Sequence, residues 1–316
     1  MKKIISTYRF PAYAIILLFL ASCSKDPLPP LVEFYGKLDE YLITFKVKEA
    51  NVDTYLWDFG DGNTSTEKEP SHTYLKGGVY TVTLAVTGVG GETSRQRNFE
   101  VAISMEELLS GGPSVVNGKT WVMSKTYTPG AEGAGPFSDD VKLTQDAFEN
   151  VLDYFRLADQ YKDEFTFFSD GSYKVNPSDD GLILAGIIFG MKTGTIVKPS
   201  RYPDLLPLCA SSYSPPAGGK WSLDYDDYNA TGLVFNTSIS NYEAKNITFH
   251  FNGSKNKVAR LAFSDGQYIG IKDYSPLFVI KNISATSMVV GIPISIDATY
   301  WDKPGIILYF TFVPKN

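Results

Sequence analysis

The segment that most restricts the fold spans residues 79–87, where apolar and threonine side chains alternate. One face of this segment carries four apolar residues: Tyr80, Val82, Leu84 and Val86. Threonines at 81, 83 and 87 occupy the other face. Successive side chains of a β-strand point to opposite faces of its sheet, so a period of two predicts a half-buried strand. Glycines at 77, 78, 88, 90 and 91 flank it and supply turns.

The composition extends this expectation to the whole chain. Apolar residues make up 43% of the 316 residues and aromatic residues 14%, with 20 Tyr and 20 Phe against only 2 His. Aromatic side chains favour the pleated, half-buried surface of a sheet. A chain of this length can bury the cores of one to three folded units. We therefore expect an all-β protein.

Two aspartates stand among glycines in Trp57-Asp58-Phe59-Gly60-Asp61-Gly62. Trp57 and Phe59 are two positions apart and so share one face of a strand, as a core pair would. Asp61-Gly62 suits a tight turn, where Asp58 is expected to accept hydrogen bonds from backbone amides. A structural calcium ion is the alternative, but the ladder of oxygen ligands that ends in a glutamate in EF-hand loops is absent. We therefore predict neither a cofactor nor a metal site here.

Three segments in this order resemble the PKD (polycystic kidney disease) domain: W-D-F-G-D-G at 57–62, P-S-H-T-Y at 70–74 and G-V-Y-T-V-T-L at 78–84. The resemblance implies an immunoglobulin-like β-sandwich over residues 31–103. Domains of this family usually act as spacers or interaction modules without catalysis. His72 occupies a motif position and has no cysteine or histidine nearby in the sequence, so it is a poor candidate for a metal ligand.

Residues 1–22 have the pattern of an export signal. Basic residues at 2, 3 and 9 precede an apolar run at 12–20, which is too short to cross a bilayer, since about 20 residues are needed. The following Leu20-Ala21-Ser22-Cys23 resembles the bacterial lipobox, which implies cleavage before Cys23 and acylation of its thiol. An ordinary secretory signal with an incidental cysteine is the alternative.

Residues 23–30 are expected to form a lipidated anchor and linker. Three prolines at 27, 29 and 30 favour an extended spacer. The Lys25-Asp26 pair resembles short acidic signals that send some lipoproteins of Gram-negative glycan degraders to the outer face of the outer membrane. Acyl chains contribute about 0.8 kcal/mol per buried CH₂ to membrane binding. We therefore expect a protein anchored by lipid in the outer membrane and displayed at the cell surface.

Charge and cysteine content narrow the possible partners. Removal of residues 1–22 takes away three of the 29 basic residues and none of the 35 acidic ones, which leaves a net charge of about −9. Such a chain repels phosphate backbones, so we expect no nucleic-acid partner. With Cys23 acylated, Cys209 has no partner for an intramolecular disulfide, and we expect it to be buried and inert.

A junction at 104–113 and a larger domain at 114–316 follow the sandwich. Ser104-Met105-Glu106-Glu107 has the form of a capping box and predicts a short helix. One inserted helix is predicted at about 145–160 behind Thr144, and the apolar segment 182–191 is predicted to be a buried strand or loop. We expect strands at 119–125, 164–168, 172–175, 220–224, 232–236, 246–251, 258–263, 268–271, 277–280, 287–292 and 306–313.

These strands should be mostly antiparallel. Ser-Asp-Gly turns at 169–171 and 264–266 each predict a hairpin that leads into a tyrosine. The order of a G-K-T-W strand, a D-E-F-T-F-F-S-D-G-S-Y hairpin and a G-K-W-S-L strand resembles the second domain of PKD-bearing surface lipoproteins in glycan-uptake systems. The resemblance implies a noncatalytic binder of polysaccharide. We favour a jelly-roll-like sandwich, and a lipocalin-like barrel, in which a tryptophan near the start plugs the floor, is the alternative.

The sequence offers no convincing catalytic residues. Hydrolysis of glycans usually needs two carboxylates about 5 to 9.5 Å apart, and the E-x-D-x-E segment of laminarinase-type enzymes is absent. Asp224-Tyr225-Asp226-Asp227 is more typical of a solvated turn than of an acid/base pair. His250 lies between two phenylalanines, and no G-x-S-x-G motif accompanies it. We therefore expect that the protein is not an enzyme.

A binding role is better supported. Sugar rings have apolar faces and hydroxyl edges, so a binder needs exposed aromatic rings together with carboxylates or amides. Trp301, beside Tyr300 and before Asp302-Lys303-Pro304-Gly305, is expected at an exposed loop rim, whereas Trp121 is expected in the core. Trp221 fits either the core or the ligand surface. The predicted ligand-binding residues are Trp301, Tyr300, Trp221, Asp224 and Asp226.

The small-residue loop at 128–136 is expected to be a plain flexible loop, and the border of a cleft or an ion site is its alternative.

Taken together, these features predict a noncatalytic surface lipoprotein that binds polysaccharide through its C-terminal domain, next to a glycan transporter complex. Two alternatives remain from other functional classes: a structural or adhesive lipoprotein that binds another protein, and a lipocalin-like carrier of a small apolar ligand. A hydrolase ranks below both.

Overall fold

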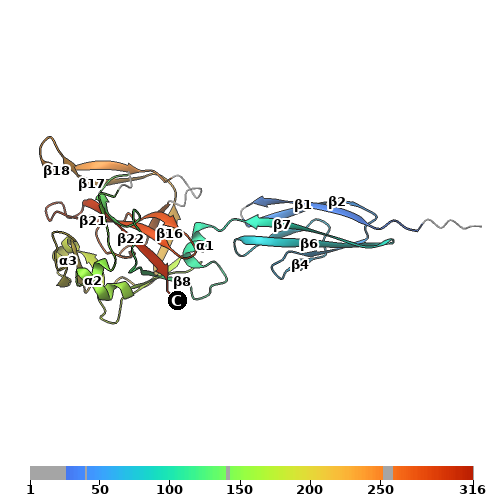
Figure 1. Cartoon of the computed structure of the whole chain (residues 1–316), viewed down its shortest axis with the longest axis horizontal. Helices are drawn as coiled ribbons and strands as arrows, with labels where there is room; N and C mark the ends of the chain where they lie inside the picture. The colour runs from blue at the N-terminus through green and yellow to red at the C-terminus, as the bar shows by residue number, and fades with distance from the viewer. Residues whose placement is uncertain (1–25, 40, 140–142, 252–258, 316) are drawn as a thin grey trace, which may run out of the picture. The chain divides into compact units, whose positions relative to one another are not determined.

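The computed structural model describes residues 26–39, 41–139, 143–251 and 259–315 (Figure 1). The signal peptide predicted at 1–22 and the lipidation site predicted at Cys23 lie outside these residues. The chain divides into two compact units, and each is considered by itself. In the described residues, no helix is both long and apolar enough to cross a membrane.

The N-terminal unit is a β-sandwich of two sheets. The first sheet contains, in spatial order, β1 (Leu31–Asp39), β2 (Leu42–Ala50) and β5 (Ser71–Thr73). The second contains β4 (Thr64–Ser65), β3 (Thr54–Asp58), β6 (Gly78–Gly88) and β7 (Gly91–Val101). Val82, Leu84 and Val86 of β6 are buried, while Thr81, Thr83 and Thr87 on the other face are not, which confirms the predicted alternation.

Aromatic rings fill the core of this sandwich. Trp57 is fully buried, its ring centroid lies 5.1 Å from that of Phe34 and 5.0 Å from that of Phe45, and its Nε1 donates to the carbonyl of Glu67 at 2.8 Å. Phe59 stacks on Phe45 at 5.6 Å. Contacts of this kind add roughly 0.5–1.5 kcal/mol per pair to the burial of the rings. The predicted core pair of Trp57 and Phe59 is confirmed.

The two aspartates beside this core hold a turn. Asp58 Oδ1 accepts the amide of Gly60 at 2.9 Å, and Asp61 Oδ1 accepts the amide of Asn63 at 3.0 Å. Gly60 has φ +78°, and a Cβ there would lie 2.6 Å from the carbonyl oxygen of Thr81. Only glycine fits this position. The hydrogen bond from the Gly60 amide confirms the predicted turn role of Asp58.

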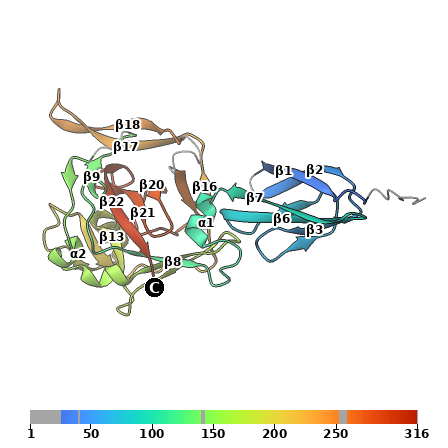
Figure 2. The ribbon, with the colours of Figure 1, turned by 45° about the vertical axis from the view of Figure 1, so that its right-hand side comes forward.

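The second unit is built on a closed ring of strands (Figure 2). The ring contains β8 (Lys119–Met123), β11 (Glu164–Phe167), β12 (Ser172–Asn176), β16 (Gly219–Asp224), β19 (Ala259–Phe263), β20 (Val279–Ile283), β21 (Met288–Ser295) and β22 (Pro304–Pro314). Each pairs antiparallel with the next, and Phe312–Pro314 of β22 pair with Trp121–Met123 of β8 to close it. This is an up-and-down barrel.

The jelly-roll-like sandwich favoured by the sequence is therefore wrong, and the barrel alternative describes the sheet. A sandwich needs two sheets with open edges, whereas here the last strand pairs with the first. Trp121 is fully buried in the barrel core, as predicted, and its Nε1 donates to the carbonyl of Leu109 at 2.9 Å.

Three excursions leave the ring. The first, β9 (Gly133–Pro136) and β10 (Gln145–Asp146), adds two strands beside β22. The second forms a small sheet of β13 (Ile183–Gly186), β15 (Leu208–Ser211) and β14 (Ile196–Pro199) with helix α3 (Ile187–Thr193). The third is a long hairpin of β17 (Tyr228–Asn236) and β18 (Asn241–Phe249).

The barrel interior is filled by its own chain. Tyr268, Ile269 and Ile271, in the connection between β19 and β20, are fully buried. Gly270 between them has φ +66°, and a Cβ there would lie 2.8 Å from the Phe312 ring and 2.9 Å from Ile292. The strand predicted at 268–271 and its hairpin are therefore wrong, because this segment plugs the barrel. A lipocalin-like carrier of a small apolar ligand would need an open chamber inside the barrel, and this segment occupies space there.

The helices differ from the expectation of a single insertion. Helix α1 (Met105–Ser110) begins as predicted, with Ser104 accepting the amide of Glu107 at 3.1 Å. The helix predicted at 145–160 is reduced to α2 (Val151–Tyr154) and the 3₁₀ helix η1 (Ala158–Lys162), because Asn150 and Arg156 adopt left-handed backbone angles that interrupt it. The segment 182–191, predicted to be a buried strand or loop, contains the buried strand β13 and most of α3, whose Met191 is exposed, so its second half is a helix.

Two buried tyrosines, Tyr268 of the plug and Tyr173 of β12, offer a matched test of the packing of the plug. The Tyr173 hydroxyl donates to the carbonyl of Tyr268 at 2.6 Å, whereas the Tyr268 hydroxyl has no partner among the described residues. Tyr173→Phe should lower the free energy of unfolding by about 1–3 kcal/mol, because it leaves a buried carbonyl unpaired. Tyr268→Phe should leave it unchanged or raise it by about 1 kcal/mol. Urea denaturation measures both, and equal losses would show that the Tyr268 hydroxyl is bonded.

Candidate functional site

The connection between β21 and β22 presents two aromatic rings to solvent. Tyr300 is 42% exposed and Trp301 is 40% exposed, which confirms the predicted position of Trp301 at a loop rim. Asp297 Oδ1 accepts the amides of Thr299 at 2.6 Å and Tyr300 at 3.2 Å. A side chain that bonds the backbone two and three residues on fixes a turn. The two rings are therefore held by a capped turn.

Trp301 is the outer member of a row of aromatic rings. Its centroid lies 4.5 Å from that of Tyr274, with 64° between the ring planes. Tyr274 in turn lies 5.1 Å from Phe189 of α3, and Phe189 lies 5.5 Å from Tyr213. Phe189 is buried and Tyr274 is half-buried. The indole is thus supported from behind by a packed aromatic layer.

A buried carboxyl and a serine hold the backbone of Trp301. Ser295 Oγ lies 3.0 Å from Asp273 Oδ1 and 2.7 Å from the carbonyl oxygen of Trp301. A hydroxyl has one proton and can donate only once. Both contacts become hydrogen bonds when Asp273 is protonated, because it then donates to Ser295 Oγ while Ser295 donates to Trp301. Burial raises the pKa of Asp273 to about 6, so the folded protein holds this form below about pH 6.

The inserted sheet closes over this carboxyl. A Cβ on Gly186 would lie 1.9 Å from Asp273 Oδ2, so only glycine permits the approach. The amide of Gly186 donates to the carbonyl of Lys272, and the amide of Lys272 donates to that of Leu184, each at 2.9 Å. Lys272 Nζ lies 5.1 Å from the Phe189 ring centroid, and burial lowers the pKa of this lysine. Strand β13 therefore positions the support of Trp301.

The structure does not bring the other three predicted ligand-binding residues to this turn. Trp221 is 8% exposed, and its Nε1 donates to the carbonyl of Phe168 at 2.9 Å, so this ring belongs to the core. Asp224 pairs with Arg260, which lowers the pKa of Asp224, and also accepts the amide of Asp226 at 2.9 Å. All three lie on or just after β16, which β19 and β20 separate from β21. We do not include them in the site.

The remaining polar candidates differ in exposure and contacts. His250 Nδ1 lies 3.0 Å from Asp227 Oδ2, and both side chains are more than half exposed. Cys209 is fully buried, as expected, and burial raises the pKa of its thiol to about 12. In the loop at 128–136, Glu132 is 4% exposed and burial raises its pKa.

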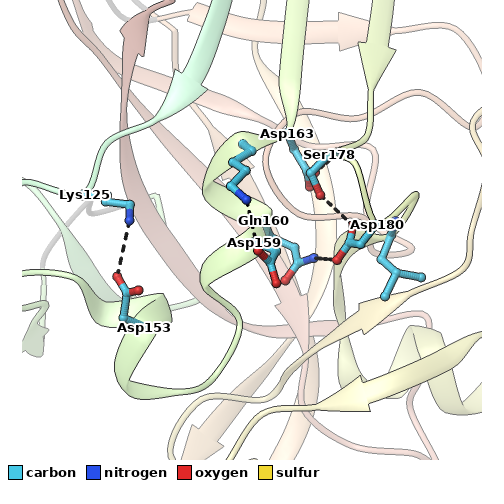
Figure 3. Close-up of polar contacts among 9 residues, drawn as sticks. Lys125, Asp153, Asp159, Gln160, Asp163, Ser178 and Asp180 are labelled. Atoms are coloured by element: carbon cyan, nitrogen blue, oxygen red, sulfur yellow. Dashed lines mark hydrogen bonds and ion pairs between the residues drawn. The ribbon is translucent and has the colours of Figure 1, made fainter.

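A cluster of acidic side chains lies near η1 (Figure 3). Asp180 accepts the Ser178 hydroxyl at 2.6 Å and Gln160 Nε2 at 3.2 Å. Asp163 is fully buried, accepts the amide of Ser178 at 3.0 Å, and has its pKa raised by burial to about 7. The pairs Lys125–Asp153 and Lys162–Asp159 are exposed. These contacts tie the chain after β12 to the start of β11, which is a structural role.

Sequence reasoning missed Asp273, Tyr274 and Ser295. None of them lies in a motif, and they meet Trp301 only through tertiary packing. In the sequence, the polar stretch after Trp301 was the single feature that predicted an exposed turn there.

A comparison with protein families matches residues 40–103 to the model of the PKD domain. The pre-pro-metalloprotease PrtV of Vibrio cholerae is 27% identical over 118 residues, which are 36% of this chain and 13% of the protease. Collagenase ColA of Bacillus cereus is 46% identical over 52 residues, or 16% of this chain and 5% of the collagenase. The chain thus spans only a small part of the length of these relatives.

Among solved structures, the PKD1 domain of the Vibrio cholerae metalloprotease PrtV is 35% identical, with 23% of this chain and 98% of that domain covered and a TM-score of 0.23. The match of residues 40–103 to the family model confirms the PKD domain predicted from the W-D-F-G-D-G motif.

The buried Asp273 predicts a measurable pH dependence. Its folded pKa of about 6 exceeds the ordinary 3.8, so between pH 4 and 6 the folded state keeps a proton that the unfolded state releases. Its contribution to stability therefore falls as pH rises through this window, by up to about 3 kcal/mol. Asp273→Asn does not titrate and keeps a donor for Ser295. Its stability relative to the parent should rise from pH 4 to 7 in urea denaturation.

The control for this measurement is Asp302→Asn, an exposed carboxyl on the same turn. Lys303 lowers the pKa of Asp302, so loss of this group should give a small change of opposite sign. Parallel profiles for the parent and Asp273→Asn would contradict a shifted pKa at Asp273.

Proposed function

We propose that this protein, whose residues 40–103 form a PKD domain, is a noncatalytic surface lipoprotein that binds polysaccharide through its barrel unit. The observation that carries the proposal is the pair of exposed rings, Tyr300 and Trp301, on a turn that is fixed before any ligand arrives. Ordering of loops on binding costs affinity, so a fixed turn favours capture.

The chemistry of this turn suits a sugar. An exposed indole offers a flat apolar surface for the CH face of a pyranose ring. Asp302 and Lys303 follow directly, with Nζ of Lys303 2.9 Å from Asp302 Oδ1, and the same Nζ lies 5.8 Å from the Tyr300 ring centroid. Charged groups beside exposed rings can bond hydroxyl edges. A small apolar ligand would leave these groups unused.

The ionisation of nearby carboxyls supports a role without catalysis. A general acid needs a raised pKa together with access to the substrate. The pKa of Asp297 is lowered by the backbone amides it accepts, and that of Asp302 is lowered by Lys303. Asp273 has a raised pKa but is 2% exposed. None of these three carboxyls combines both properties.

The remaining parts of the proposal concern location and partners. A lipid on Cys23 would anchor the chain in the outer membrane, with the proline-rich linker and the PKD domain as spacers. The barrel unit would then hold polysaccharide at the cell surface for a neighbouring glycan transporter complex. The support is the lipobox-like sequence and the spacer-like PKD domain.

Trp301→Ala tests the binding site. The change removes the stacking surface and should abolish or weaken by at least tenfold the binding of any polysaccharide that the parent recognises. Native gels cast with soluble β-glucan, xyloglucan, galactomannan, arabinoxylan, pectin or dextran measure this as retardation. Tyr35→Ala removes a 51% exposed ring from β1 of the N-terminal sandwich and is the matched control. Equal retardation of Trp301→Ala and the parent would reject this site.

Cys23→Ala tests the anchor. The parent should incorporate an alkyne-labelled palmitate and partition with the outer membrane, while Cys23→Ala should remain unlabelled. Cys209→Ala is the control, because Cys209 is buried and should not affect labelling. Palmitate labelling that survives in Cys23→Ala would refute the anchor.

A further inference from the structure

A groove of about 810 Å³ lies beside the turn that carries Trp301. Its walls come from α3, from the β17–β18 hairpin and from the two ends of the β21–β22 connection, through Met191, Phe235, Tyr242, Ile296 and Gly305. Figures 1 and 2 show the hairpin as a separate layer on one side of the barrel. Binding clefts for small molecules measure roughly 300–1,000 Å³, so this groove has the size of a ligand site.

The hairpin presents an aromatic pair to this groove. Phe235 and Tyr242 are direct cross-strand partners, their ring centroids lie 5.3 Å apart, and they are 52% and 40% exposed. The base of the hairpin is packed, since Leu233 is 1% exposed and a Cβ on Gly232 would clash with Phe137. The hairpin is therefore anchored at its base and leaves two rings open to solvent. Exposed apolar patches of this kind mark binding sites.

The groove is continuous with the Trp301 turn. Ile296, in its wall, directly precedes the Asp297 that caps the turn, and Gly305 follows Pro304 at the start of β22. On its other side, the groove shares Gln145 and Leu205 with a second hollow of about 270 Å³, where Phe148 and Tyr154 are 44% and 49% exposed. Exposed rings thus border the groove at both sides.

We propose that this groove is an additional subsite that takes further sugar units of the same polysaccharide chain bound at Trp301. This inference rests on the proposed function. The groove pairs apolar and aromatic walls with Thr144, Gln145 and Asp204, which are groups that can bond hydroxyls. Because it continues past the turn, the protein recognises an internal stretch of chain, and affinity increases with the number of sugar units.

The test uses full-length protein extracted in detergent. Oligosaccharides of two to ten units are prepared by partial hydrolysis of whichever panel polysaccharide retards the parent, and titration calorimetry gives Kd for each length. The parent should bind the longest at least tenfold more tightly than the shortest. Tyr242→Ala should weaken binding of the longest by at least fivefold and leave the shortest unchanged, whereas Trp301→Ala should weaken every length.

Two further variants guard against misfolding. Tyr242→Phe keeps the ring and should bind as the parent does. Ile239→Ala removes a 61% exposed side chain at the hairpin tip, outside the groove lining, and should also have no effect.

The outcomes separate the two proposals. Equal affinity at all lengths, or binding of long chains by Tyr242→Ala equal to that of the parent, overturns the groove subsite while polysaccharide binding stands. If no panel polysaccharide retards the parent, both proposals fall. If Tyr242→Ala instead keeps the glycan affinity of the parent but no longer co-purifies with a protein that the parent binds, the groove is a protein interface and the inference is wrong.

Discussion

The pairing of β22 with β8 is the constraint on which the second unit depends. Phe312, Val313 and Pro314 pair in register with Met123, Val122 and Trp121, which joins the last strand of the ring to the first. Once these ends are paired, the segments that carry α3 and the β17–β18 hairpin lie outside the closed ring. One excursion contributes α3 and another the β17–β18 hairpin, which are two walls of the groove. The closure that makes the barrel thus also builds the surface outside it.

The filled interior of the barrel also makes the outer surface the part that other molecules can reach. Tyr268, Ile269 and Ile271 occupy the space inside the ring among Ile292 and Phe312, so a ligand meets the outside of the barrel. The outer face is in turn covered beside β21, where all eight residues from Met288 to Ser295 are buried. A strand buried on both faces is rigid, because its side chains are packed in two cores. The turn carrying Trp301 extends from this strand and inherits a fixed starting point.

Local patterns predicted the elements, and long-range pairing decided how they combine. The alternation at 79–87 and the W-D-F-G-D-G motif identified the sandwich, because each feature is contained in one short stretch of the sequence. The choice between jelly roll and barrel depended on β22 meeting β8, about 190 residues apart in sequence, which no local pattern encodes. Tyr268 resembled a strand residue because plug and strand share apolar content. In the same way, the polar neighbours of Trp301 predicted its exposure, but Asp273 and Ser295 reach it only in the folded chain.

The support of Trp301 explains why a binding turn would retain a costly buried carboxyl. Asp273 is enclosed by Gly186 and the backbone of β13, and burial opposes its charged form. An apolar residue there would avoid this cost but would remove the carboxyl contact that holds Ser295 beside the Trp301 carbonyl. The network therefore exchanges some stability for a defined backbone position at the rim. Stacking depends on the orientation of a ring, and that orientation follows from the backbone that carries it. In the proposed binding role, the carboxyl therefore acts through geometry without contact to the ligand.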